Sequence, residues 1–333
     1  MQSAANTEWG NQSSITEFIF LGFENIQDLR VLLFLVFLAI YIVTMTVNML
    51  IIALVMAGQH LHTPMYYFLG NLAFMETCYT SIILPRLLSS LLTGDRTISV
   101  MGCITQMYFF GSLAAAECYL LAAMSYDRYL AICKPLHYAT CMTCRFCLQL
   151  TAGSWISAFL AISIIVSFVS QLTFCGPNEI DHFFCELILV VKLSCSDTNV
   201  VEFVAFLFAL IFTLPPFLFT IISYVLIIAT ILRISSITGK QKAFSTCSSH
   251  LVVVTIFYGT LMIAYMLPKN NTLRDLNKLF SVFYAVLTPM VNPLIYSLRN
   301  KDVKQTLKKY ASMFLAFPRI QTIRANPLRI TPS

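Results

Sequence analysis

The sequence predicts an all-α fold, in which a bundle of seven transmembrane helices is followed by a short amphipathic eighth helix. Only 11% of the residues are charged, against about 25% in ordinary soluble domains. The chain also contains long stretches without a charged residue, each long enough to cross a bilayer as a helix. In lipid the backbone must satisfy its own hydrogen bonds, and these stretches lack the apolar–polar alternation of barrel strands, so we expect helices.

Seven crossings can be placed in order along the chain. Five of them contain no Asp, Glu, Lys or Arg, and two contain an acid in their interior, Glu76 or Glu117. The charge-free crossings are 31–57, 146–178, 203–232, 243–268 and 279–298, and the other two lie near 63–92 and 103–133. The chain therefore divides into an extracellular tail (1–28), a seven-helix domain (29–298) and a cytoplasmic segment (299–333). The first residues lack the pattern of a cleaved signal peptide, so we expect the first helix to direct insertion.

The distribution of basic residues predicts the orientation. Seven crossings place the two termini on opposite sides, and Lys and Arg concentrate on the cytoplasmic side of membrane proteins. With the N-terminus outside, the inner face holds fourteen of the 21 basic residues. The net charge of +6 is then a cytoplasmic band rather than a nucleic-acid patch, which would require a soluble basic face.

The outer face carries candidate modification sites. Asn11 begins an N-x-S glycosylation acceptor in the exposed tail. Four of the 11 cysteines lie outside, where the compartment is oxidising enough to join them, and four cysteines allow three pairings. They are Cys103, Cys175, Cys185 and Cys195. On the inner side, Cys141, Cys144 and Cys147 share a short segment, and we expect them to be reduced and without a metal.

Polar residues inside the membrane are costly there, which makes them functional candidates. Glu76 and Glu117 lie in the middle of the second and third crossings, Asn48 in the middle of the first and Asn292 late in the seventh. Two facing carboxylates would share a proton or hold a cation such as Na⁺. The alternative is two protonated acids that each hydrogen-bond a neighbouring helix. We expect the paired arrangement, with Na⁺ as a possible structural ion and no other cofactor.

Two motifs near the inner ends of helices are candidates for a conformational switch. Asp127-Arg128-Tyr129 ends the third crossing just before a Lys-Pro helix break. An arginine held by the adjacent carboxylate can be released to bind something else, whereas the simpler interpretation is an interfacial arginine. Asn292-Pro293-x-x-Tyr296 lies near the inner end of the seventh crossing, where the proline removes a backbone hydrogen bond and permits a kink.

The outer halves of the third, fifth and sixth crossings are the candidate ligand pocket. No charged side chain is found among the candidates, so a small apolar ligand with one or two hydrogen-bonding atoms fits best. Ordinary helix packing is the alternative explanation for the same residues. They are Met107, Phe110, Gly111, Ala114, Ala115, Phe208, Phe212, Tyr258 and Tyr265.

The segment 299–315 has the pattern of an amphipathic helix. Val303, Leu307, Tyr310 and Phe314 recur at helical spacing among lysines. Such a helix is expected to lie on the anionic inner leaflet, which makes membrane lipid a partner.

Several segments, each at the expected membrane depth, carry a resemblance to a known family. The chain resembles a vertebrate odorant (olfactory) receptor of the rhodopsin-like G-protein-coupled class, of the larger tetrapod type, from about residue 16 to about residue 309. The matching segments are LHTPMYYFLGNL at 61–72, MSYDRYLAICKPLHY at 124–138, SY at 223–224, KAFSTCSSHL at 242–251 and PMVNPLIYSLRNKDV at 289–303. One departure is Glu76, where aspartate is commoner.

The resemblance implies a receptor, not an enzyme, that binds a small odorant and activates a stimulatory, olfactory-type G protein to raise cyclic AMP. It also implies a location in the plasma membrane of olfactory neuron cilia. It pairs Cys103 with Cys185 and Cys175 with Cys195. Arg128 corresponds to the arginine that faces the G protein, and Tyr258 to the aromatic residue at the pocket floor. The residues that rearrange on activation correspond to Tyr224, Asn292 and Tyr296.

Two other functions compete with this one. The first is a different seven-helix receptor, for a hormone or a lipid. The second is a transporter or channel that uses Glu76 and Glu117 as an ion path, although transporters often show two related halves with broken helices.

Overall fold

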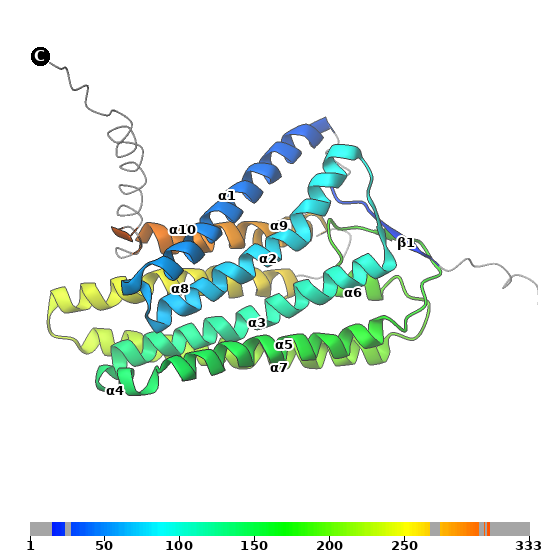
Figure 1. Ribbon diagram of the computed structural model, residues 1–333. Coiled ribbons are helices and arrows are strands. Elements are labelled where there is room, and N and C mark those ends of the chain that lie inside the picture. The colour runs from blue at the N-terminus through cyan, green and yellow to red at the C-terminus, as the bar shows by residue number, and fades with distance from the viewer. Residues whose placement is uncertain (1–14, 24–27, 267–273, 300–302, 304, 307–333) are drawn as a thin grey trace, which may run out of the picture.

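A computed structural model describes residues 15–23, 28–266, 274–299, 303 and 305–306. Long helices run side by side along most of the molecule (Figure 1). Six of them are continuous, and the seventh is formed by α9 (Arg274–Val282), the π-helical segment η4 (Phe283–Leu287) and α10 (Thr288–Arg299) in succession. The six are α1 (Arg30–Ala57), α2 (Pro64–Thr93), α3 (Val100–Cys133), α5 (Cys144–Val169), α7 (Asn199–Arg233) and α8 (Ile237–Met266).

Helix α3 lies at the centre of the bundle. Of its most apolar stretch, 67% is buried inside the protein, against 22% for α1 and 11% for α7. The exposed apolar side chains of α1 and α7 therefore cover the outside, where lipid accepts them. Residues such as Val31, Leu35, Phe203 and Phe206 are more than half exposed.

Five helical spans of the described chain are long and apolar enough to cross a membrane, and a sixth qualifies if the two parts of α8, inclined at 43°, count as one span. Helix α2 is 30 residues long but does not reach the same apolarity. It packs against α1, α3 and α5, and nearly half of its residues are buried. Polar side chains such as Glu76 and Thr80 are thereby shielded from lipid.

Several boundaries differ from those that hydropathy predicts. The fourth crossing was predicted to reach residue 178, but α5 ends at Val169 and the chain continues as a loop. The seventh crossing begins at Arg274, before the charge-free stretch. Lys278 can lie inside this crossing because it has partners within the protein. Its Nζ donates to the Gly22 carbonyl at 2.9 Å and forms an ion pair with Asp181. The Lys-Pro break is as expected, since α3 ends at Cys133 and α4 (Pro135–Cys141) follows.

One end of the bundle carries a small three-stranded sheet that the sequence did not predict. Strand β1 (Glu17–Phe20) pairs antiparallel with β2 (Thr97–Ser99) and parallel with β3 (Glu179–Ile180). The sheet joins the N-terminal segment to the two loops that follow α2 and α5. The described residues also form two short helical segments, η2 (Gln59–Leu61) and α6 (Leu187–Val191). The helix α6 lies at the same end as β1, and α4 lies at the opposite end (Figure 1).

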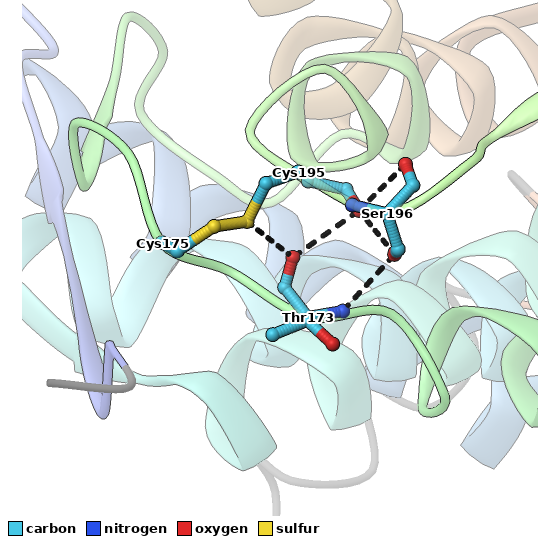
Figure 2. Close-up of a disulfide and its surroundings, with 5 residues drawn as sticks. Thr173, Cys175, Cys195 and Ser196 are labelled. Atoms are coloured by element: carbon cyan, nitrogen blue, oxygen red, sulfur yellow. Dashed lines mark hydrogen bonds between the residues drawn. A yellow bond between two sulfur atoms is a disulfide. The ribbon is translucent and has the colours of Figure 1, made fainter. Parts of the chain in front are cut away.

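Both disulfides lie near the sheet, and we call this end of the bundle the disulfide end and the opposite one the α4 end. Cys103 in the first turn of α3 is bonded to Cys185 in the loop after α5, with a Cα–Cα distance of 5.5 Å. Cys175 is bonded to Cys195 within the same loop. Around this second bridge, the Cys195 amide donates to the Thr173 carbonyl at 3.0 Å and the Thr173 amide donates to Ser196 Oγ at 3.2 Å (Figure 2).

The loop between α5 and α7 is thus fixed to α3 by a covalent bond and to Gln106 by the 2.9 Å hydrogen bond from the Cys185 amide to Oε1. We expect Cys103→Ser to lower the stability of the purified protein by about 2–4 kcal/mol, because the bridge closes a long loop. The thermal midpoint in detergent measures this. Cys144→Ser is the matched control, since Cys144 is exposed and free, and an equal loss in both variants would contradict the prediction.

Candidate functional site

The membrane-interior polar residues meet between α2 and α10. Asn292 Nδ2 donates to Glu76 Oε1 at 2.7 Å, and both side chains are buried. The Glu76 carbonyl accepts from Thr80 Oγ1 at 2.7 Å. A hydrogen bond of this kind is stronger in an apolar interior than in water. This hydrogen bond joins α10 to α2 through two residues that lie 216 positions apart in the sequence.

Asn48 repairs the backbone defect that Pro293 creates in α10. A helical residue donates its N–H to the carbonyl four positions earlier, so Pro293, which has no N–H, leaves the Pro289 carbonyl without its usual donor. Asn48 Nδ2 donates to that carbonyl at 3.1 Å and to the Thr44 carbonyl at 3.0 Å. The fully buried Asn48 side chain therefore ties α1 to α10.

The two membrane-interior acids do not hydrogen-bond each other in the described chain. Glu117 is 7% exposed, and its Oε1 has no hydrogen-bond partner among the described residues. The Oδ1 atoms of Asn48 and Asn292 are also buried without such partners. Among the described residues, the region therefore holds more acceptor oxygens than there are donors to satisfy them. The described residues contain no group of three or more His, Cys, Asp or Glu arranged as a metal site, the inner cysteines included.

The Asp127-Arg128 motif forms an ion pair at the α4 end. Arg128 Nε donates to Asp127 Oδ2 at 2.9 Å, and Nη2 forms an ion pair with the same oxygen. The other carboxylate oxygen accepts from Tyr138 of α4 at 2.8 Å. Asp127 is fully buried, so these contacts satisfy a charge that would otherwise be costly. The Asp127-Arg128-Tyr129 motif alone did not predict that Tyr138 hydrogen-bonds Asp127.

The remaining switch candidates lie on α3, α7 and α10. Tyr224 Oη lies 2.7 Å from His250 Nδ1 and donates to the Cys247 carbonyl at 3.3 Å, which joins α7 to α8. Tyr129 packs against this group. Tyr296 is buried, and its hydroxyl has no hydrogen-bond partner among the described residues. His250 was not among the predicted switch residues, although it lies within the motif at 242–251 that carries the resemblance.

The predicted pocket residues divide into two groups. Phe110 lies within an aromatic cluster, with ring centroids 4.6 Å from Tyr79, 4.9 Å from Phe184 and 6.1 Å from Tyr284. Ala114 and Ala115 pack against the same core. Gly111 points elsewhere: a side chain there would meet Ile162 of α5 at 3.5 Å. Gly111 therefore lies at the contact between α3 and α5, and its role in the pocket stays a prediction.

The second group connects α3, α7 and α8. Met107 packs in the core cluster that contains Cys103 and Cys185, with Phe208 against it. The rings of Phe208 and Phe212 are stacked 5.9 Å apart. Tyr258 is 2% exposed and donates from its hydroxyl to the Cys118 carbonyl at 3.2 Å. The side chain of Tyr265 lies outside the described residues, as does Asn11. Of the predicted eighth helix, only Val303, Gln305 and Thr306 are described.

The described chain thus combines helices long and apolar enough to cross a membrane, a buried acid–amide contact between α2 and α10, and an Asp–Arg pair at the α4 end. A family model described as "Olfactory receptor" matches residues 37–313. The chain is 49% identical to human olfactory receptor 6B1 over 304 residues, which cover 91% of this chain and 97% of that protein. It is 48% identical to human olfactory receptor 10A7 and 46% identical to mouse olfactory receptor 6B9, in each case over 90% of this chain and 95% of the relative.

The chain belongs to the olfactory receptor family. It is a seven-transmembrane, multi-pass membrane protein of the G-protein-coupled class and not an enzyme. Olfactory receptors bind small odorants and couple to G proteins.

We expect the hydrogen bond from Tyr138 to Asp127 to contribute to the stability of the protein. Burial raises the pKa of Tyr138, and the neighbouring Asp127 carboxylate raises it further. The stabilisation is therefore present at neutral pH and is lost as the pH rises beyond the ordinary tyrosine range. We expect Tyr138→Phe to lower the thermal midpoint of the purified protein by an amount equivalent to about 1.5 kcal/mol, since it removes a hydrogen bond to a charged group.

Tyr126→Phe is the matched control for this variant. Tyr126 lies next to Asp127, and its ring packs on Tyr129 and Phe146, contacts that a phenylalanine keeps. Equal thermal midpoints for the two variants would show that the hydroxyl of Tyr138 contributes nothing.

Proposed function

We propose that this olfactory receptor binds a small, mostly apolar volatile odorant and activates a stimulatory, olfactory-type G protein, which raises cyclic AMP. The observation that carries the proposal is the Asp127–Arg128 ion pair at the α4 end. A buried carboxylate that holds an arginine next to a helix end is a two-state element, since the arginine can exchange this partner for another. Arg128 is only 11% exposed in its side chain, so binding the G protein requires its release.

The apolar character of the ligand is supported by the residues on α3, α7 and α8. Met107, Phe208, Phe212 and Tyr258 place apolar and aromatic surface close together and offer no ionised partner for a charged ligand. A pocket of this kind discriminates weakly between ligands, because each methylene is worth only about 1–3 kcal/mol.

We further propose that the α4 end faces the cytoplasm, with the N-terminus outside and Asn11 glycosylated. The support is the charge asymmetry, since the predicted topology assigns fourteen of the 21 basic residues to the inner side. Disulfides at the opposite end agree with an oxidising exterior. The plasma membrane of olfactory cilia is the location that suits a receptor for airborne ligands.

A cation or proton at Glu76 and Glu117 is a second part of the proposal. It is supported by the surplus of buried acceptor oxygens, namely Glu117 Oε1, Asn48 Oδ1 and Asn292 Oδ1, without protein donors among the described residues. A Na⁺ ion binds such oxygens, and a shared proton would satisfy one of them. Either would bias the receptor towards the state in which these oxygens are close together.

The coupling proposal is tested with Arg128→Ala in cells that carry a cyclic AMP reporter, after an odorant panel has identified an agonist for the wild type. We expect odorant-evoked cyclic AMP to be lost at equal surface expression, because the variant lacks the charge that would contact the G protein. Arg145→Ala is the control, an exposed arginine at the same end of the bundle. Staining of an N-terminal tag on intact cells measures surface expression and also tests the orientation. A full response in Arg128→Ala would refute the proposed role.

The ion site is tested by measuring basal and odorant-evoked signalling against Na⁺ concentration and pH. We expect Glu76→Gln and Glu117→Gln to weaken the Na⁺ and pH dependence seen in the wild type, because each removes a carboxylate. Glu202→Gln is the control, since Glu202 is exposed in the first turn of α7. If both variants keep the wild-type dependence at normal surface expression, the two acids have a structural role only.

A further inference from the structure

Three cysteines lie close together at the α4 end, where α4 leads into α5 (Figure 1). Cys141 is the last residue of α4, Cys144 is the first residue of α5, and Cys147 follows about one turn later. All three are free thiols, and Cys141 and Cys144 are exposed whereas Cys147 is buried. Two accessible thiols are therefore present at this end of the bundle, and the functions described above give them no role.

The first turn of α5 fixes the position of Cys144. The Thr143 hydroxyl accepts from the Phe146 amide at 3.3 Å, and the Thr143 carbonyl accepts from the Cys147 amide at 3.0 Å. The Phe146 ring packs on Tyr126 of α3, and the Cys147 side chain belongs to the hydrophobic core. Because these two side chains point inward, Cys144 lies on the outer surface of the helix.

The outer surface of α5 is apolar from its second turn onward. Leu148 lies four positions after Cys144, and residues four positions apart in a helix are neighbours on its surface. Leu148, Ile156 and Leu160 are all more than half exposed. Because α5 is long and apolar enough to cross a membrane, these side chains are in contact with lipid. Cys144 therefore lies at the edge of a lipid-covered surface.

The residues around Cys144 on its other side are polar or charged. Arg145 is exposed, and so are Lys134, His137 and Thr143 in the segment that precedes α5. Basic residues of this kind concentrate where a crossing meets the cytoplasm. Cys144 thus lies at the boundary between the apolar and the charged surface. Cysteines next to a membrane-crossing segment are typical sites of reversible S-acylation.

Cys141 has an accessible thiol but no lipid-facing neighbour. One turn before it lies His137, which is exposed and polar. The apolar Leu136 is also exposed, but it lies five positions before Cys141 and therefore on a different face of α4. Helix α4 contains no buried residue and is only seven residues long, so it is not a crossing. The geometry therefore favours Cys144 over Cys141.

We propose that Cys144 is S-acylated with a long-chain fatty acyl group, whose chain lies in the inner leaflet beside Leu148. This proposal rests on the proposed orientation, in which the α4 end faces the cytoplasm. The Cys144 sulfur attacks the carbonyl carbon of a fatty acyl thioester of coenzyme A. A new carbon–sulfur bond forms, the bond to the coenzyme A sulfur breaks, and the thiol proton passes to that sulfur. The acyl chain anchors in the bilayer the junction between α5 and α4, the helix whose Tyr138 hydrogen-bonds Asp127.

The test is acyl exchange on the full-length protein from mammalian cells. Disulfides are reduced and free thiols are blocked with N-ethylmaleimide, and hydroxylamine then releases thioester-bound cysteines for reaction with a polyethylene glycol maleimide. We expect one hydroxylamine-dependent shift in gel mobility for the wild type and its loss in Cys144→Ser. Cys141→Ser and Cys147→Ser are the matched controls, since each removes one thiol from the same stretch, and both should keep the shift. Feeding cells an alkyne-bearing palmitate analogue should label the same variants.

Folding is measured separately from acylation. Because the acyl chain lies in lipid outside the packed core, Cys144→Ser should keep the wild-type thermal midpoint in detergent. The proposal is overturned if the wild type shows no hydroxylamine-dependent shift, or if the shift persists in Cys144→Ser and disappears in Cys141→Ser.

The orientation is measured with an N-terminal tag in cells whose plasma membrane alone is opened with digitonin. Staining of the tag on intact cells supports the outer N-terminus, and a missing shift in such cells overturns the acylation proposal alone. Staining only after digitonin treatment would place the N-terminus in the cytoplasm and would overturn the orientation and the acylation together. None of these measurements depends on cyclic AMP, so a failure of odorant signalling is distinguishable from a failure of this proposal.

Discussion

The hydrogen-bond requirement of polar groups inside an apolar bundle constrains this structure more than any other factor. Pro293 leaves a carbonyl of α10 without its helical donor, and Asn48 of α1 supplies one from outside the helix. Asn292, one position before the proline, donates to Glu76 of α2. Because lipid cannot replace these partners, the three helices must stay close together at this depth. Replacement of Asn48, Asn292 or Glu76 by an apolar residue leaves a buried polar group unsatisfied, which generally costs about 1–3 kcal/mol.

The two ends of the bundle are held by different kinds of interaction. At the disulfide end, a covalent bond, a three-stranded sheet and the contacts of Lys278 join the N-terminal segment, both loops and α9. At the α4 end, the described links between helices are few and non-covalent, such as the Tyr138–Asp127 and Tyr224–His250 hydrogen bonds. A rearrangement at the α4 end therefore breaks a few hydrogen bonds, whereas one at the disulfide end would require a bond to be broken and a sheet to be separated.

Much of the fold follows from the sequence because hydropathy and charge report directly on the membrane. The crossings were placed to within a few residues where apolar stretches end in charged loops, as for α1 and α7. The boundary of α5 was misplaced because its uncharged loop, including Gln171 and Asn178, resembles a crossing in charge alone. The sheet around β1 could not be predicted, since its partners are about 80 and 160 residues away and each strand is short. The sequence also could not predict that Gly111 faces α5, because a helix that is apolar on all its faces has no periodic pattern of hydropathy.

Helix α3 connects the features on which the proposed mechanism depends. Cys103, Phe110, Glu117 and Asp127 all lie on it, from the disulfide end to the α4 end. The disulfide fixes its first turn, and Tyr138 of α4 holds the carboxylate near its last turn. The helix is therefore a poor candidate for large movement. Two elements of the bundle depart from a straight α-helix: α8 changes direction by 43° along its length, and the seventh crossing contains the π-helical turn η4. A ligand against α3 would act on these neighbours, and a separation of α7 from α8 would break the Tyr224–His250 hydrogen bond.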